Sequence, residues 1–462
     1  MSDTIDGHLF SHMKAFGVIR KRISNAHPEH HAIFRGMALV ALFVFLGKLA
    51  GAAKEMAIAY RYGISGQVDA YLFIYNLISW PVGVWFSILT VVLVPLAARI
   101  RQEDASSELP RFRAELLALA LVLGCDLALI FWFGLPMLIR SSWLGLSIST
   151  VSIAADIIPD MVALAPLGVL ASLFSAWMLA SERHTNTLLE SVPALAILVA
   201  LLILPSDGVE PLVWGTVAGS ICHVACLATP LAWKGEIETP RFTSHSPQWL
   251  PFWQGFGIML VGQTLMSFTG IIDQFFAAQL DTGAIATISY ANRILALILG
   301  LGATAVSRAT LPVFSRIKSQ GGEQLQGIAM FWVRLMVVFG VGAMIAGWWL
   351  APLIVKLLFE RGAFTARSTE AVTEVFRYGL AQMPFFFPAL ALVALLASQG
   401  KHKLIAISGS TNLLVKTGAN YILVPIMGIN GIMMATVIMI MASFFQLYWF
   451  SAMVLKQRET TG

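Results

Sequence analysis

The chain has 462 residues, of which 58% are hydrophobic and 12% are charged, and its mean hydropathy is +0.78. A typical soluble domain is about 45–50% apolar and about 25% charged, so this chain has too few charges to cover a soluble surface. The composition excludes a soluble enzyme, a disordered chain and a fibrous protein, and indicates an all-α polytopic membrane protein. The net charge of +5 does not predict nucleic-acid binding, because the basic residues lie in short loops between apolar segments.

A bilayer core requires about 20 apolar residues per helix. On that basis the sequence predicts about twelve transmembrane helices, near residues 34–60, 69–98, 113–139, 160–181, 187–204, 211–233, 250–278, 284–312, 328–357, 372–398, 403–425 and 430–455. The first apolar run begins near Ile33, too far along the chain and too long for a cleaved signal peptide, so we expect it to remain as a membrane anchor. Residues 1–32 and 457–462 are expected to be cytoplasmic tails.

The distribution of Lys and Arg predicts the orientation. With the N-terminus inside, eighteen of these residues fall in cytoplasmic segments and six in outer loops. Because positive residues are retained on the cytoplasmic side, both termini are predicted to be cytoplasmic.

The sequence also repeats itself at an offset of 217 residues. Gly83 corresponds to Gly300, Pro95 to Pro312 and Arg99 to Arg316. Six spans per half give both halves the same orientation, and a pseudo-two-fold axis along the membrane normal would relate them, as in many transporters. We therefore expect six-helix lobes at 33–235 and 250–456, joined by a cytoplasmic linker at 236–249.

Basic residues inside the spans are the first candidates for a functional site. A charge at bilayer depth costs at least about 2.5–3.5 kcal/mol unless it faces a polar cavity. Lys48 and Lys54 lie in the first span, where they could flank one cavity or extend toward the membrane surface. Arg293 lies about ten residues into the eighth span, and its repeat counterpart is Asn76, so these two side chains are expected to face each other across the centre. An ion pair between Arg293 and Asp273 is the structural alternative.

Acidic residues are fewer. Asp69 begins the second span, where it could cap a helix or pair with Lys48 or Lys54. Asp273 and Glu55 are candidate ligands for a coupling ion. Because basic residues outnumber acidic ones within the spans, the cavity suits an anionic substrate such as a pyrophosphate head group better than a drug cation.

No catalytic signature is recognisable. The phosphate-binding loop of ATPases is missing, as is any Ser/His/Asp or Cys/His set, so we expect a transporter and not an enzyme. Cys222, His223 and Cys226 could share a helix face, but buried span residues are the better interpretation, and no metal site or cofactor is predicted.

Several motifs together resemble one family. Gly47-Lys48-x-x-Gly51-x-x-Lys54-Glu55, Tyr62-Gly63 and Asp69-Ala70-Tyr71 are similar to the start of MviN/MurJ proteins, the lipid II flippases of the multidrug/oligosaccharidyl-lipid/polysaccharide exporter superfamily. Further matches lie in Tyr290–Arg293, Leu311–Ser315 and Leu358–Thr365, the last of which resembles the family's loop before helix ten.

The resemblance implies a V-shaped flippase of the bacterial inner membrane. Its central cationic cavity would bind an undecaprenyl-pyrophosphate-linked glycan, and its other partners would be membrane lipids and the machinery that synthesises envelope glycans. Lys48, Lys54, Asp69 and Arg293 match the family's cavity positions, and Asn76 and Arg361 are further candidates. Membrane potential, H⁺ and Na⁺ remain open as energy sources.

The chain departs from the family in three ways. Lys48 and Lys54 stand where the family usually has Arg, Asn76 replaces a residue that is often basic, and the twelve predicted spans are two fewer than the usual fourteen. The substrate could therefore be lipid II or another lipid-linked glycan, such as an exopolysaccharide or O-antigen unit. A cation-coupled exporter of small molecules, with the same superfamily fold, is the alternative function.

Overall fold

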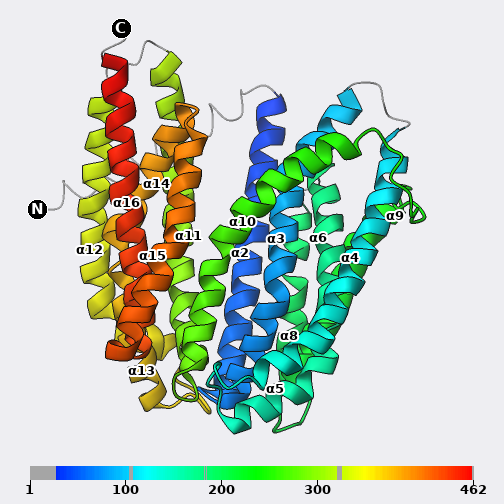
Figure 1. The fold of residues 1–462 in the computed structure, drawn as a ribbon, viewed down its shortest axis with the longest axis vertical. Helices are drawn as coiled ribbons and strands as arrows, with labels where there is room; N and C mark the ends of the chain where they lie inside the picture. Colours follow the sequence, from blue (N-terminus) through cyan, green and yellow to red (C-terminus); the bar gives the residue numbers. More distant parts are fainter. Residues whose placement is uncertain (1–27, 103–107, 182, 184, 320–324, 460–462) are drawn as a thin grey trace, which may run out of the picture.

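The computed structural model describes residues 28–102, 108–181, 183, 185–319 and 325–459. The described part of the chain is helical, with no strand among its elements (Figure 1). In chain order the helices are α2 (Pro28–Tyr62), α3 (Gly66–Gln102), α4 (Glu108–Ile139), α5 (Ile148–Met161), α6 (Leu164–Ala180), α7 (Asn186–Leu189), α8 (Val192–Ile203), α9 (Glu210–Ala232), α10 (Trp249–Ala278), α11 (Ala284–Ser319), α12 (Leu325–Phe359), α13 (Ala366–Leu380), α14 (Met383–Ser398), α15 (His402–Met427) and α16 (Ile429–Glu459).

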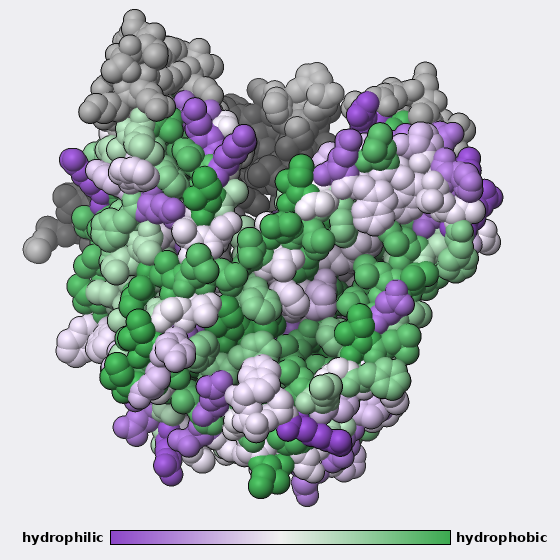
Figure 2. Space-filling model, viewed as in Figure 1, coloured by the Kyte–Doolittle hydropathy of each residue, from purple (hydrophilic) through white to green (hydrophobic). Residues whose placement is uncertain are grey.

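Each predicted span falls on one helix or on one closely spaced helix pair. Among the described residues, eight spans are long and apolar enough to cross a membrane, and two bent pairs could each provide one more. Green, hydrophobic side chains cover the middle of the molecular surface, and purple, hydrophilic ones gather toward both ends, as expected for a protein surrounded by lipid (Figure 2). The chain is therefore an all-helical, multi-span membrane protein.

The predicted boundaries differ from the observed ones at both tails and at the starts of two spans. Residues 28–32, assigned to a tail, already belong to α2, while residues 1–27 of that predicted tail lie outside the described residues. The predicted C-terminal tail is helical to Glu459, and 460–462 also lie outside the description. The predicted spans at 160–181 and 372–398 begin too late, because α5 and α13 extend them at the outer end.

The two bent pairs occupy corresponding places in the two halves. The bend between α5 and α6 is 50°, and the bend between α13 and α14 is 43°. Pro166 and Pro384 lie just after these breaks. Proline lacks an amide hydrogen and its ring clashes with the carbonyl four residues earlier, so each helix must break or kink there. The repeated break agrees with the repeat seen in the sequence.

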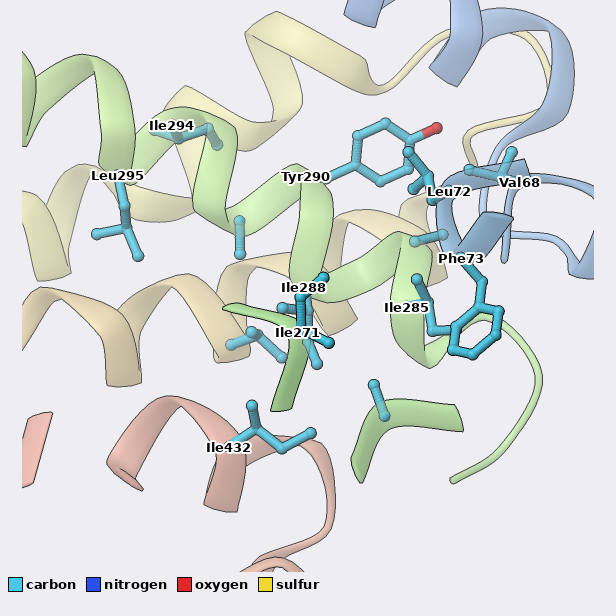
Figure 3. Close-up of a cluster of buried hydrophobic side chains, with 14 of the residues drawn as sticks. Val68, Leu72, Phe73, Ile271, Ile285, Ile288, Tyr290, Ile294, Leu295 and Ile432 are labelled. Carbon is cyan, nitrogen blue, oxygen red and sulfur yellow. The ribbon is translucent and has the colours of Figure 1, made fainter. Parts of the chain in front are cut away.

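Helices α11–α16 lie on one side of the molecule and α3–α6, α8 and α9 on the other, with α2 and α10 running between them (Figure 1). The two groups meet in a core to which α3, α10, α11 and α16 contribute Phe73, Ile271, Ile285 and Ile432, among others (Figure 3). We name the two ends of the molecule cytoplasmic and outer according to the count of Lys and Arg.

The outer end is closed by direct contacts between segments far apart in the sequence. The Ala363 amide donates a hydrogen bond to the Tyr60 carbonyl at 2.8 Å, and the Tyr290 hydroxyl donates to the Gly63 carbonyl at 3.0 Å. Gly362 has a φ of +59°, and a Cβ there would collide with the carbonyl oxygen of Tyr60. We call these contacts the outer seal.

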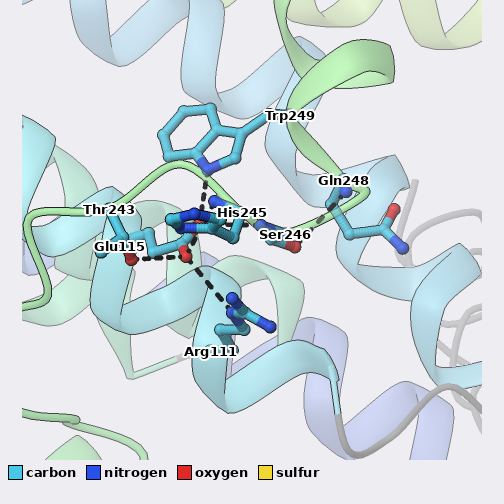
Figure 4. A network of polar contacts seen from close by, with 7 residues as sticks. All are labelled: Arg111, Glu115, Thr243, His245, Ser246, Gln248 and Trp249. Carbon is cyan, nitrogen blue, oxygen red and sulfur yellow. Dashed lines mark hydrogen bonds and ion pairs between the residues drawn. The ribbon is translucent and has the colours of Figure 1, made fainter.

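The linker between α9 and α10 is anchored to the first half. The Glu115 side chain, which is fully buried, accepts hydrogen bonds from the Thr243 hydroxyl (2.9 Å), the amides of His245 (3.2 Å) and Ser246 (3.1 Å), and the Trp249 indole (2.6 Å) (Figure 4). A buried carboxylate is stable only when its oxygens are satisfied in this way. The start of α10 is therefore fixed to α4.

Candidate functional site

A pocket of about 410 Å³ lies between α2, the segment of α7 and α8, α11 and α12. Five of its lining residues are ionisable: Lys48, Lys54, Glu55, Glu190 and Arg293. The structure thus brings three of the predicted basic cavity residues together in one place. The pocket is lined by helices from both halves of the sequence, because α2 comes from the first half and α11 and α12 from the second.

Glu55 is the centre of this charged group. One of its oxygens, Oε1, lies 2.7 Å from the Lys54 ammonium and 3.0 Å from Nε of Arg293. The side chains of Glu55 and Lys54 are 12% and 17% exposed, whereas that of Arg293 is 45% exposed. The Arg293 guanidinium therefore faces the open pocket while one edge is held by Glu55. The alternative of an ion pair between Arg293 and Asp273 is wrong.

Lys48 and Glu190 complete the pocket. Lys48 is exposed, and it makes no ion pair with the described residues. The Glu190 carboxylate accepts a hydrogen bond of 3.4 Å from the side-chain amide nitrogen of Asn186. Glu190 was not predicted from the sequence, although a carboxylate inside the predicted span 187–204 is a visible signal. With three bases and two acids, the pocket keeps an excess of positive charge.

Asp69 lies outside this pocket. Its two carboxylate oxygens accept hydrogen bonds from the backbone amides of Gly283 (2.5 Å) and Ala286 (2.7 Å) at the start of α11. Asp69 therefore caps a helix, which was one of the two predicted roles, but the helix that it caps is α11 and not its own helix α3. Ala286 is also the repeat counterpart of Asp69, so this cap joins equivalent positions of the two halves.

Asn76 lines a second pocket, of about 470 Å³, between α3, α10 and α11. Asp273 and Asn292 line the same pocket, and Arg293 does not. The expectation that Asn76 and Arg293 face each other is therefore wrong: adjacent residues of a helix point about 100° apart, and Asn292 is the one directed to the Asn76 side.

Asp273 pairs with Lys416, at 2.9 Å, and also accepts a hydrogen bond of 3.1 Å from the Asn420 amide nitrogen. These three residues lie on α10 and α15, within the second half. The place predicted for a coupling ion thus already contains a lysine ammonium.

Arg361 lies at the outer seal, away from Lys48, Lys54 and Arg293. It lines a third pocket, of about 560 Å³, together with Tyr60, Arg61 and the end of α8. Its guanidinium donates to the Leu357 carbonyl at 3.0 Å. Within the described ranges, no three His, Cys, Asp or Glu residues are grouped as a metal site, and Cys222 and Cys226 are exposed.

The chain resembles curated bacterial proteins over part of its length. Probable lipid II flippases MurJ of Bdellovibrio bacteriovorus and Helicobacter pylori are each 25% identical to it, over 230 and 276 residues. These segments cover 50% and 55% of this chain, and 44% and 59% of the relatives, so the chain spans about half the length of the curated relatives it matches.

Solved structures share the fold more completely. A structure of lipid II flippase MurJ in an inward closed conformation superposes with a TM-score of 0.78, at 18% identity, over 90% of this chain and 87% of the other. An inward-facing multidrug transporter of the MATE family gives 0.72, at 16% identity, over 90% and 96%. The chain therefore shares its helix arrangement with both of these structures.

The family model described as "Lipid II flippase MurJ" matches residues 58–460, which is most of the chain. The sequence resemblance to this family is thereby confirmed, and so is the multi-pass location in a bacterial inner membrane. The chain belongs to the MurJ lipid II flippase family.

Proposed function

We propose that this protein is a flippase that moves lipid II, a polyprenyl-pyrophosphate-linked glycan, from the inner to the outer leaflet of the bacterial cytoplasmic membrane. The observation that carries the proposal is the convergence of Lys48, Lys54 and Arg293 on one pocket between the two halves. Family membership and the names of the curated relatives favour lipid II over other lipid-linked glycans. A transport role requires no covalent chemistry, in agreement with the missing catalytic signature.

The pocket has the chemistry that a pyrophosphate needs. Arg presents a planar set of donors that fits phosphate oxygens, and Lys adds compact positive charge. Glu55 pairs with Lys54 and with one edge of Arg293. We expect the pyrophosphate to take over contacts that Glu55 makes, so that Lys54 and Arg293 are never left without an anion inside the membrane.

The outer seal defines the direction from which this pocket is loaded. Since the two halves are joined at the outer end, the substrate would enter from the cytoplasmic end or from the inner leaflet. Release would require the contacts of Tyr60 with Ala363, and of Tyr290 with Gly63, to separate. This sequence of events is alternating access, in which one half rocks against the other.

Two other substrates remain as outcomes of the test. Another polyprenyl-pyrophosphate glycan would use the same three basic residues, and the mass of the bound lipid distinguishes it from lipid II. A small-molecule exporter is kept as a second candidate because the MATE transporter shares the fold. The basic pocket argues against a cationic drug as its substrate.

The experiment is native mass spectrometry of the protein purified in mild detergent from cells that make lipid II. We expect a bound polyprenyl-pyrophosphate glycan on the wild type, and at least about tenfold less on Arg293→Gln and Lys54→Gln, because loss of one charge-assisted phosphate contact costs about 1.5–3 kcal/mol.

Arg140→Gln is the matched control, since Arg140 is an exposed arginine beyond the end of α4 and outside the pocket. It should retain as much lipid as the wild type. If the wild type retains phospholipid but no pyrophosphate lipid, or if all three variants lose lipid equally, the proposal fails and small-molecule export is tested next.

A further inference from the structure

A buried lysine in the second half lies in a cage of oxygen atoms. The Lys416 ammonium contacts a carboxylate oxygen of Asp273 at 2.9 Å, the main-chain carbonyl of Ile432 at 3.2 Å and the hydroxyl of Thr436. These ligands come from α10 and α16, and Lys416 itself from α15. The Lys416 side chain is only 1% exposed, so the ammonium has exchanged its water shell for these oxygens.

The three oxygens form the kind of ligand set that proteins use for hard metal cations. Carboxylate, backbone carbonyl and hydroxyl oxygens are typical ligands of such ions. An ammonium group has three hydrogens and can satisfy three acceptors in one place. The cage therefore fits either a lysine ammonium or a bare monovalent cation.

Asn420 provides an independent indication of a cation site. It lies one helical turn after Lys416, is completely buried, and donates its amide nitrogen to the same Asp273 oxygen, Oδ1. Its own amide oxygen has no partner within the described residues. Turning the amide about its last bond would exchange oxygen and nitrogen and place a further oxygen ligand near Asp273.

We infer that the Lys416 ammonium is a tethered monovalent cation, which fills a site that would otherwise bind a free alkali-metal ion. Asp273 supplies the one negative charge of the cage, and Lys416 neutralises it within the chain. Helices α10, α15 and α16 are thereby held together without a dissociable ion.

This inference goes beyond the proposed substrate and does not depend on it. Asp273 also lines the 470 Å³ pocket between the halves, so an ion in the cage would be in a position to couple its binding to movement of α10. A covalently attached cation cannot leave. Any ion gradient that drives this protein would therefore act at another site.

The test measures the temperature of half-unfolding of the purified protein in detergent, in NaCl, KCl, LiCl or choline chloride at equal ionic strength. The wild type should unfold at the same temperature in all four salts. Lys416→Ala removes the ammonium and leaves space for an ion, so its unfolding temperature should rise by roughly 3 °C in saturating NaCl relative to choline chloride. Lys416→Ser should behave in the same way.

Two controls isolate the cage. The double variant Lys416→Ala/Asp273→Asn should lose the response, because the negative ligand is gone. Lys403→Ala removes an exposed lysine from the same helix and should resemble the wild type. If a Lys416 variant does not fold in choline chloride, its yield of folded protein should recover in NaCl. The inference is overturned if sodium stabilises the wild type. It is also overturned if sodium changes neither the unfolding temperature nor the folded yield of either Lys416 variant. Neither result bears on lipid binding.

Discussion

Two ion-pair groups in this molecule use the same chemistry in opposite surroundings. Around Glu55, two basic groups share one carboxylate at the edge of an open pocket, and Arg293 is 45% exposed. Around Asp273, one ammonium is enclosed by three helices and is 1% exposed. The two carboxylates are similarly buried, because Glu55 is 12% and Asp273 15% exposed, so the difference lies in the cations. A cation that reaches water, such as Arg293, costs little to separate from its partner, whereas a fully buried one such as Lys416 becomes an uncompensated charge. The first group is therefore suited to exchanging its anion for a substrate, and the second to holding helices in place.

The largest effect is expected from breaking the enclosed group. Asp273→Ala leaves the Lys416 ammonium buried without its counter-ion, which should lower the free energy of unfolding by about 3–5 kcal/mol. Denaturant or thermal unfolding in detergent measures this change. The exposed Asp281→Ala, eight residues along the chain, is the control and should change stability by less than about 0.5 kcal/mol. Equal effects of the two variants would show that the Asp273–Lys416 pair stabilises the fold no more than an exposed carboxylate does, and would refute its role in holding the helices in place.

A third carboxylate sharpens the comparison, because Glu115 is buried and is satisfied mainly by neutral donors. Glu115→Ala leaves the Trp249 indole and two backbone amides without their acceptor, so we expect a loss of about 2–3 kcal/mol. The linker should also become sensitive to proteases between Lys234 and Gln248. Glu370→Ala, at an exposed position, should leave both the stability and the digestion pattern unchanged.

Changing the outer seal tests whether the Glu55 pocket depends on closure at that end. Gly362→Ala combines a positive φ with a collision against Tyr60, and should destabilise the sealed arrangement by about 1–2 kcal/mol. A cysteine introduced at Ala52, in the pocket, should then react faster with a membrane-impermeant thiol reagent applied from outside. Gly235→Ala is the control. Gly235 also has a positive φ, but a Cβ there would meet no atom within 4 Å, so this variant should leave the reaction rate of the cysteine unchanged.

The smallest effect is expected from removing the exchangeable anion. Glu55→Gln takes away the competitor for Lys54 and Arg293, so retention of a pyrophosphate lipid should increase about 2–5-fold. Native mass spectrometry against titrated lipid measures this change. Glu190→Gln alters the same pocket without breaking an ion pair and should have a smaller effect. A decrease on Glu55→Gln would show that Glu55 orients the basic residues instead of competing for them.

Local features of the sequence predicted most of the fold. Hydropathy located the helix or helix pair at each of the twelve predicted spans, because a helix that contacts lipid must be apolar along its own length. Within the described residues, eight spans, or ten with the two bent pairs, are long and apolar enough to cross a membrane. Lys48, Lys54 and Arg293 were also predictable from local sequence, since charged residues inside apolar segments are conspicuous. Partners were not predictable. Glu55 and Arg293 are 238 residues apart, and only the tertiary fold brings their side chains together. For the same reason the sequence could not show that Asp69 caps α11, or that Lys416 reaches Asp273.

One consequence of the way α10 is held concerns the mechanics of the molecule. Its first residue, Trp249, is attached to α4 through Glu115, and Asp273, near its other end, is attached to α15 and α16 through Lys416. These two attachments are 24 residues apart in the sequence, which corresponds to about 36 Å of helix. When one half rotates relative to the other, α10 must flex like an elastic rod clamped at both ends, or one clamp must release. The stiffness of this single helix would then contribute to the barrier between the two orientations, so mutations along it could alter the rate of transport without touching the substrate.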